Sequence, residues 1–183
     1  MLKSRRVYLR KITMADADTL FKWGQDPRYQ KTAGFAHYQN FAQAQQAAVI
    51  YSQRKYSYGL CLKHNQQLIG TVELYERGID KNSGLLQSKS LGFLLDKAYE
   101  HHGYMTEGLK LLISYDFTEM KQEELWANTF TNNLRSQHLL KKLGFKYMYS
   151  VDYRQISEIF SYSEKYYLLK RGDWIRIEPN EES

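Results

Sequence analysis

The sequence has little of what marks secreted, metal-binding or membrane-spanning proteins. Cys61 is the only cysteine among 183 residues, so no internal disulfide can form and we expect a cytoplasmic protein. The five histidines are scattered, and no cysteine and histidine set has the spacing of metal ligands, so no metal is expected. No apolar run is long enough to cross a bilayer, and the basic residues 1–6 lack the apolar stretch of a signal peptide. Cys61 lies in the apolar stretch 58–62, which favours a buried, inert thiol over a nucleophile.

Proline is also scarce, with two residues, and no repeat, low-complexity segment or proline-rich linker divides the chain. Hydrophobic residues make up 43% and charged residues 25%, the balance of a globular protein with a sizeable core. We therefore predict one domain over residues 5–175, followed by a short polar tail at 176–183.

The chain has an excess of positive charge and many aromatic residues. Lysine and arginine number 26 against 20 aspartates and glutamates, which gives a net charge of +6. Such a balance attracts anionic partners, either a phosphate-bearing ligand or nucleic acid, although solvated lysines alone would produce the same count. The sixteen tyrosines and eight phenylalanines suit a core, an aromatic groove or a subunit contact, and the last would make a homodimer.

Hydrophobic spacing and turn residues predict an alternation of strands and helices. Capping patterns at Thr13 and at Asn40 start two helices, and Asp26-Pro27 ends the first of them, which leaves a long aromatic and basic loop at 27–39. His64-Asn65-Gln66 joins two strands as a hairpin. Strands are predicted at 7–11, 57–63, 67–75, 91–95, 124–130, 145–151 and 165–170, with helices at 14–25, from 41, at 105–120 and at 133–142. This alternation indicates a mixed sheet with helices on both faces.

The chain is organised around the stretch 99–108, which follows the apolar strand 91–95 and opens into a helix. The first turn of a helix carries unpaired backbone N–H groups and the positive end of the helix dipole, so such a loop can hold a phosphate. Gly103 allows the backbone to approach a ligand closely because it has no Cβ. A plain connecting turn would have the same pattern, so this stretch alone leaves both interpretations open.

A second stretch follows the predicted strand 124–130. Asn133 and Ser136 form the pattern N-x-x-S, and Leu140 begins the pattern L-x-x-x-G-F, which ends at Phe145. Three further stretches occur in the same order as in a known family: 7–23 near the start, 68–72 in the middle and 166–174 near the end.

With these five stretches the sequence resembles the GNAT superfamily of acyl-CoA-dependent N-acetyltransferases, and within it the RimJ and RimL type that acetylates ribosomal-protein N-termini. The resemblance covers nearly the whole chain. It implies the GNAT fold: a mixed, mostly antiparallel central sheet whose two middle strands splay apart to form a cleft for acetyl-CoA, with helices on both faces.

The resemblance also implies which residues bind acetyl-CoA. The pantetheine arm would lie along the backbone of one strand, the diphosphate would meet the backbone of the loop, and an asparagine would contact the arm. These positions are, in chain order, Phe93, Leu94, Leu95, His101, His102, Gly103, Tyr104, Met105, Thr106 and Asn133. Two residues depart from the family pattern of the phosphate-binding loop. The first position of the pattern is usually Gln or Arg in the family, but this chain has Glu100 there. The last position is usually Gly or Ala, but this chain has Met105.

Acetyl transfer to an amine needs a neutral nucleophile, a polarised thioester carbonyl and a proton for the departing thiolate. The resemblance assigns Ser136 as the donor of that proton or as the stabiliser of the thiolate, because Leu140 occupies the position of the tyrosine that other members use. At the two positions where other family members have a glutamate as the base, this chain has Asn128 and Ser90. Glu73, acting directly or through water, is the remaining candidate base.

In this family the loop at 27–39 flanks the acceptor site, so Tyr29, Phe35 and Tyr38 are the predicted acceptor-binding residues. The expected acceptor is a protein or peptide N-terminal amine, such as that of a ribosomal protein. A polyamine, an aminoglycoside or an amino acid stays open as an acceptor. So do two other functions: an acyl-CoA-binding regulator without activity, and a basic nucleic-acid binder, for which no RNA-binding motif is present.

Overall fold

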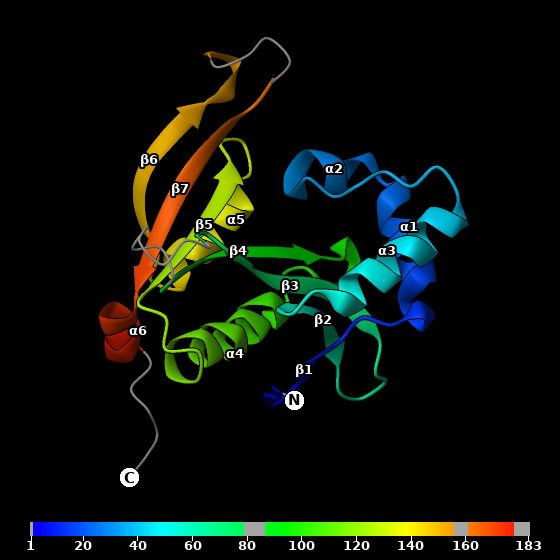
Figure 1. Ribbon diagram of the computed structural model, residues 1–183, viewed down its shortest axis with the longest axis horizontal. Helices are drawn as coiled ribbons and strands as arrows, with labels where there is room; N and C mark the ends of the chain where they lie inside the picture. The colour runs from blue at the N-terminus through cyan, green and yellow to red at the C-terminus, as the bar shows by residue number, and fades with distance from the viewer. Residues whose placement is uncertain (1, 79–86, 156–160, 178–183) are drawn as a thin grey trace. The chain divides into compact units, whose positions relative to one another are not determined.

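A computed structural model describes residues 2–78, 87–155 and 161–177 of the protein (Figure 1). Its strands are hydrogen-bonded in the order β1-β2-β3-β4-β5-β7-β6. The chain divides into two compact units: unit 1 combines Met1–Leu74 with Gly92–Leu112, and unit 2 combines Tyr75–Leu91 with Ile113–Ser183. Strand β4 (Ser88–Leu95) and helix α4 (Tyr104–Thr118) each contribute one part to unit 1 and the other to unit 2, and the last two residues of β3 (Leu68–Glu76) belong to unit 2.

Unit 1 contains the first three strands and the helices that follow them. The elements are β1 (Val7–Arg10), the 3-10 turn η1 (Met14–Asp16), α1 (Ala17–Gln25), α2 (Pro27–Ala33), α3 (Phe41–Gln53), β2 (Ser57–Leu62), β3 (Leu68–Glu76), the second half of β4 (Ser88–Leu95), η2 (Lys97–Tyr99) and the first part of α4 (Tyr104–Thr118). β2 pairs antiparallel with both β1 and β3. The predicted hairpin is confirmed, with Gln66 in the left-handed region at φ +61°.

Helix α2 corrects the predicted loop at 27–39. Proline was interpreted only as the end of α1, but its fixed φ and missing N–H also suit the first turn of a new helix. Asp26 caps that helix, because its side chain accepts a hydrogen bond from the backbone N–H of Arg28 at 2.9 Å. Gly34, at φ +62°, ends it. One residue therefore separates α1 from α2.

The core of unit 1 forms where α1 and α3 pack together, as Figure 1 shows. Asn40 caps α3 as predicted, its side chain accepting from the N–H of Gln43 at 3.1 Å. Trp23, on α1, is fully buried and packs edge-on against Phe35 at 6.2 Å. Cys61 is also fully buried, and this burial raises the pKa of its thiol to about 11, as expected for an inert cysteine.

Unit 2 contains the later strands of the sheet. Its elements are the first half of β4, the rest of α4, β5 (Glu124–Phe130), α5 (Leu134–Lys142), β6 (Lys146–Asp152), the 3-10 turn η3 (Tyr153–Gln155), β7 (Ser163–Lys170) and α6 (Arg171–Ile177). β4 runs parallel to β5, whereas β7 pairs antiparallel with β5 on one side and β6 on the other. Figure 1 shows β6 and β7 as a long two-stranded ribbon within this unit.

The turn after α5 requires glycine. Gly144 has φ +90°, and a Cβ on it would overlap the side chain of Ile177 in α6. Helix α6 is absent from the sequence-based prediction, and it takes the first two residues of the predicted tail at 176–183; the remaining six lie outside the described residues. Residues 79–86 and 156–160, for which no helix or strand was predicted, also lie outside the described residues.

Among the described residues, the antiparallel pairs and the parallel pairing of β4 with β5 confirm the predicted mixed, mostly antiparallel sheet. The splay of its middle strands stays a prediction. Among the described residues, none of the helices combines the length and the apolar character needed to cross a bilayer.

Unit 2 contains an unusual buried carboxylate. Asp116 of α4 is fully buried, and neither of its carboxyl oxygens has a hydrogen-bond partner among the described residues. Burial raises its pKa from 3.8 to about 7; the positive charge of Lys89 opposes this shift and the negative charge of Glu76 adds to it. The ammonium of Lys89, itself buried, donates to Glu76 at 2.6 Å.

This carboxylate makes stability depend on pH. The unfolded state loses the Asp116 proton near pH 3.8 and the folded state near pH 7, so the free energy of unfolding falls as the pH rises between these values. We predict that Asp116→Asn removes a fall on the order of 2 kcal/mol between pH 5 and pH 8, measured by urea denaturation. The control is Asp18→Asn, which changes an exposed aspartate of α1. An unchanged pH dependence in the Asp116 variant would contradict the assignment.

Candidate functional site

The loop that enters α4 has two residues in the left-handed region. His101 has φ +65° and Gly103 has φ +80°, a conformation that side chains with a Cβ adopt at a cost. The carbonyl oxygen of Gly103 accepts a hydrogen bond from the backbone N–H of Glu107, and this bond closes the first turn of α4. The amides of the following residues therefore lie in the first turn of α4, where helix geometry leaves N–H groups available to an anion.

A network of hydrogen bonds from the N-terminal segment fixes this first turn. Glu107 accepts from the hydroxyl of Ser4 at 2.6 Å, from the backbone N–H of Arg6 at 2.8 Å and from Nε of Arg6 at 2.8 Å. Nη1 of Arg6 also donates to the carbonyl oxygen of His102 at 3.0 Å. Burial acts to raise the pKa of Glu107, but these bonds outweigh it and the pKa is lowered. Sequence reasoning missed this network, because its members are about 100 residues apart.

The two histidines of the loop differ in their surroundings. The side chain of His101 is 77% exposed, with Nε2 at 4.0 Å from Oε2 of Glu100. His102 is held more firmly: its Nδ1 donates to the carbonyl oxygen of Glu100 at 2.6 Å, and its ring stacks on Tyr104 at 5.6 Å. His101 is thus the more open of the two to a ligand.

The side chains at the start of α4 face in different directions. Met105 is 4% exposed and belongs to the core, whereas Tyr104 and Thr106 are half-buried. The guanidinium of Arg6 lies over the ring of Tyr104, with Cζ 4.8 Å from its centroid. An anion would therefore meet Met105 through its backbone and not through its side chain.

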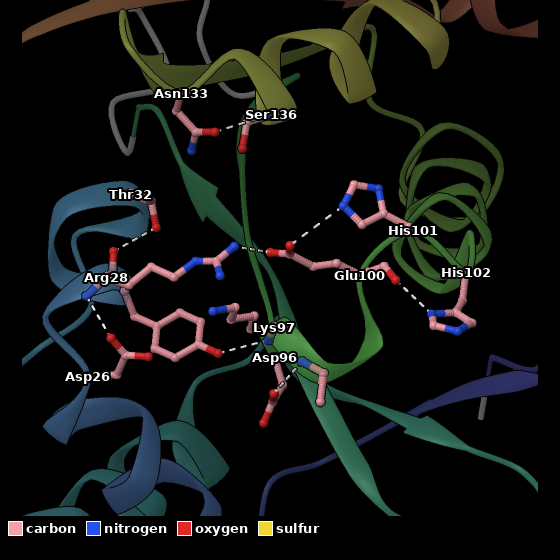
Figure 2. A network of polar contacts seen from close by, with 12 residues as sticks. Asp26, Arg28, Thr32, Asp96, Lys97, Glu100, His101, His102, Asn133 and Ser136 are labelled. Atoms are coloured by element: carbon pink, nitrogen blue, oxygen red, sulfur yellow. Dashed lines mark hydrogen bonds and ion pairs between the residues drawn. The ribbon is translucent and has the colours of Figure 1, made fainter.

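Glu100 pairs with a residue from a distant helix. Nη2 of Arg28, in α2, donates to Oε1 of Glu100, and Figure 2 shows the two side chains extended toward each other. Close by, the hydroxyl of Tyr29 accepts from the backbone N–H of Lys97 at 2.8 Å. Helix α2 is thus joined to the segment that precedes the loop by a salt bridge and a hydrogen bond.

The end of β4 leads into this segment. Leu94 is buried, whereas Phe93 and Leu95 are half-buried. The backbone N–H of Asp96 donates to the carbonyl oxygen of Ile69 in β3 at 2.8 Å. Burial acts to raise the pKa of Asp96, but hydrogen bonds from Trp23, the backbone of Ala98 and Lys22 lower it. An open cleft of about 530 Å³ lies between α1, the start of α2 and residues 96–98.

In unit 2, Asn133 is the N-cap of α5. Its side-chain oxygen accepts from the backbone N–H of Ser136 at 3.2 Å, a contact drawn in Figure 2. Ser136 is half-buried in the first turn of that helix. The structure therefore gives Asn133 a capping role, and its contact with acetyl-CoA stays a prediction.

The predicted base and acceptor residues are buried in unit 1. Glu73 of β3 is 4% exposed and accepts from Nη1 of Arg54 at 3.1 Å. The nearby Tyr51 has a raised pKa, chiefly through burial and then through the charge of Glu73. The three predicted acceptor-binding aromatics have similarly low exposure, and they belong to the core cluster around Trp23: Tyr29 (5%), Phe35 (7%) and Tyr38 (6%).

No group of three or more potential metal-binding side chains occurs in the part of the chain that the structure describes. The loop itself fits acetyl-CoA on the features needed to hold a diphosphate. Its backbone is fixed in a left-handed turn at Gly103, it opens a helix of fifteen residues, and Arg6 and Arg28 lie next to it.

Known proteins resemble this chain in sequence and in fold. The profile of the family described as "Acetyltransferase (GNAT) domain" matches residues 6–146. The "Probable N-acetyltransferase YjcK" of Bacillus subtilis (strain 168) is 29% identical over 159 residues, which span 79% of this chain and 83% of YjcK. A solved structure of a GNAT-family acetyltransferase from Bacillus anthracis has a TM-score of 0.79 at 17% identity, covering 93% of this chain and 98% of that one.

Two other solved structures belong to acetyltransferases whose descriptions name different acceptors. RimL, a ribosomal L7/L12 alpha-N-protein acetyltransferase, has a TM-score of 0.71 at 12% identity and covers 91% of each chain. The spermidine/spermine N-acetyltransferase SpeG from Vibrio cholerae also has a TM-score of 0.71, at 14% identity, and covers 93% of this chain and 97% of its own. Because the family profile spans more than half of the sequence, this chain belongs to the GNAT family and is an N-acetyltransferase whose acetyl donor is acetyl-CoA.

Proposed function

We propose that the acceptor of this N-acetyltransferase is a protein or peptide N-terminal amine, as in the RimJ and RimL branch. The observation that supports this acceptor most directly is charge. A polycationic acceptor such as spermidine needs unpaired carboxylates, but the chain has a net charge of +6. The carboxylates beside the cleft in unit 1 already have partners, because Asp26 caps α2 and Asp96 accepts from Trp23 and Lys22.

Acetyl-CoA supplies the activated acetyl thioester, and the amine attacks it directly in a complex with both substrates. In the proposal the backbone of Phe93, Leu94 and Leu95 binds the pantetheine arm. The diphosphate binds at the start of α4, through the backbone of Gly103 and its neighbours His101, His102, Tyr104, Met105 and Thr106. Asn133 contacts the arm in addition to capping α5.

Ser136 is the proposed proton donor to the departing thiolate, or the residue that stabilises this thiolate. It lies in the first helical turn of α5, where the positive end of the helix dipole favours a developing negative charge. Glu73 is the proposed base, acting directly or through water, since it is the buried carboxylate of β3 whereas Glu76 is 47% exposed. Tyr29, Phe35 and Tyr38 form the proposed wall of the acceptor site, and the homodimer stays a prediction of the tyrosine content.

Acetyl-CoA binding should stabilise the folded protein. At about one hundred times its dissociation constant, a ligand adds about 2.7 kcal/mol, which corresponds to a rise in melting temperature of about 5–10 °C for a domain of this size. Gly103→Val should abolish most of this rise, because valine cannot easily adopt φ +80°. The matched control is Gly172→Val, at an exposed position with open space around it. A Gly103 variant with the full rise would remove the phosphate cradle from the proposal.

The acceptor is tested by counting thiol released from acetyl-CoA. We expect turnover with short peptides that have a free N-terminus and none with the same peptides after N-terminal blocking, even when they contain lysine. Turnover only with spermidine, an aminoglycoside or free amino acids would reject the protein acceptor. Binding of acetyl-CoA without turnover on any of these acceptors would instead favour a regulator.

Replacing Ser136 by alanine should lower kcat by about 10²-fold and leave the affinity for acetyl-CoA nearly unchanged, since a proton donor acts only in the transition state. Ser52→Ala, an exposed serine on α3, is the matched control. Equal kcat values in the Ser136 variant and the unmodified protein would exclude this serine from the chemistry.

A further inference from the structure

The position of Glu100 raises an electrostatic problem. Its carboxylate lies three residues before Gly103, at the beginning of the loop whose backbone is proposed to hold a diphosphate. Two negative groups repel each other most strongly where solvent is partly excluded, and the side chain of Glu100 is only 20% exposed. An anion can bind next to this carboxylate only if a cation offsets its charge.

The salt bridge to Arg28 supplies that cation. Nη2 of Arg28 donates to Oε1 of Glu100, and both side chains are largely shielded, at 25% and 20% exposure. Guanidinium is a planar fork with five N–H donors, so it can bond a carboxylate with one edge and a phosphate with another. Figure 2 shows the guanidinium reaching from α2 to Glu100, with His101 and His102 of the loop on the other side of Glu100.

Helix α2 holds Arg28 in this place before any ligand binds. The backbone N–H of Arg28 donates to the cap residue Asp26, and the next residue, Tyr29, is buried with its hydroxyl bonded to the backbone of Lys97. A donor that is already positioned loses less conformational entropy when its ligand arrives. Arg28 is therefore prepared for an anion at the loop.

We propose that Arg28 binds the diphosphate of acetyl-CoA and that Glu100 is the positioning residue that holds its guanidinium at the loop. The proposal rests on the proposed location of the diphosphate at the start of α4. It explains why a carboxylate is compatible with a phosphate site: Glu100 orients the arginine that binds the phosphate.

The test measures affinity by calorimetric titration of two ligands: acetyl-CoA, and S-acetylpantetheine, which has the thioester arm without the phosphates. Arg28→Ala should weaken acetyl-CoA binding by about 10- to 100-fold and leave S-acetylpantetheine binding unchanged. Arg28→Lys, which keeps the charge without the fork, should give a smaller loss in the same direction, and it serves as the test if the alanine variant does not fold.

Glu100→Gln should weaken acetyl-CoA binding by about 2- to 10-fold, because the guanidinium is no longer held. The matched control is Lys31→Ala, which removes an exposed positive charge from the same helix and should change the affinity less than 2-fold.

Three outcomes would overturn the proposal. In the first, Arg28→Ala binds acetyl-CoA like the unmodified protein. In the second, Arg28→Ala weakens both ligands equally, which would mean that it only supports the shape of the site. In the third, Glu100→Gln tightens acetyl-CoA binding, and the variant that combines Arg28→Ala with Glu100→Gln binds acetyl-CoA like the unmodified protein. This result would mean that Arg28 merely neutralises Glu100. If the unmodified protein bound S-acetylpantetheine and acetyl-CoA equally, the phosphate cradle of the proposed function would fail as well.

Discussion

The start of α4 keeps its conformation through the three hydrogen bonds that Glu107 accepts from Ser4 and Arg6. Hydrogen bonds to a charged group contribute about 1.5–3 kcal/mol each, so the three together exceed the strain of about 1–3 kcal/mol of a non-glycine residue in the left-handed region, such as His101. The same arginine holds the carbonyl of His102 and covers the ring of Tyr104. The backbone that the proposed diphosphate would meet is thus set by contacts present before binding.

The two units treat buried carboxylates differently. In unit 1, the buried Glu73 and Asp96 and the half-buried Glu107 all accept bonds from cationic or polar donors, which offset the cost of removing a charge from water. In unit 2, Asp116 has no hydrogen-bond partner among the described residues and stays protonated until the pH approaches about 7. Low pH should therefore destabilise unit 1 through Asp96 and Glu107, whose pKa values are lowered, whereas Asp116 loses its proton as the pH rises.

Local signals in the sequence predict much of this fold. The cap at Asn40, the hairpin at His64-Asn65-Gln66 and the glycine turn before α4 are each encoded within a few residues, and the structure confirms them. Helix α2 was missed because a proline that ends one helix can also begin the next. Helix α6 was missed because its seven residues have little apolar periodicity.

The site is harder to predict, because its contacts join residues far apart in the sequence. The pairs Arg28–Glu100 and Arg6–Glu107 span 72 and 101 positions, and nothing near Glu100 in the sequence shows that it has a cation beside it. The burial of Tyr29, Phe35 and Tyr38 also depends on distant contacts, because the sequence predicts a loop for them whereas the structure packs them in the core around Trp23. Their role as acceptor-binding residues stays a prediction.

The short connection between α1 and α2 limits how this region can change in length. The indole N–H of Trp23 donates to the side chain of Asp96, and the hydroxyl of Tyr29, six residues later, accepts from the backbone of Lys97. The adjacent residues Asp96 and Lys97 therefore hold both ends of the segment 23–29. Only Asp26 lies between the two helices. Each residue of an α-helix turns the next by about 100°, so one inserted or deleted residue would rotate Tyr29 away from its partner. Between these anchors, related sequences should differ by substitution and seldom by insertion or deletion.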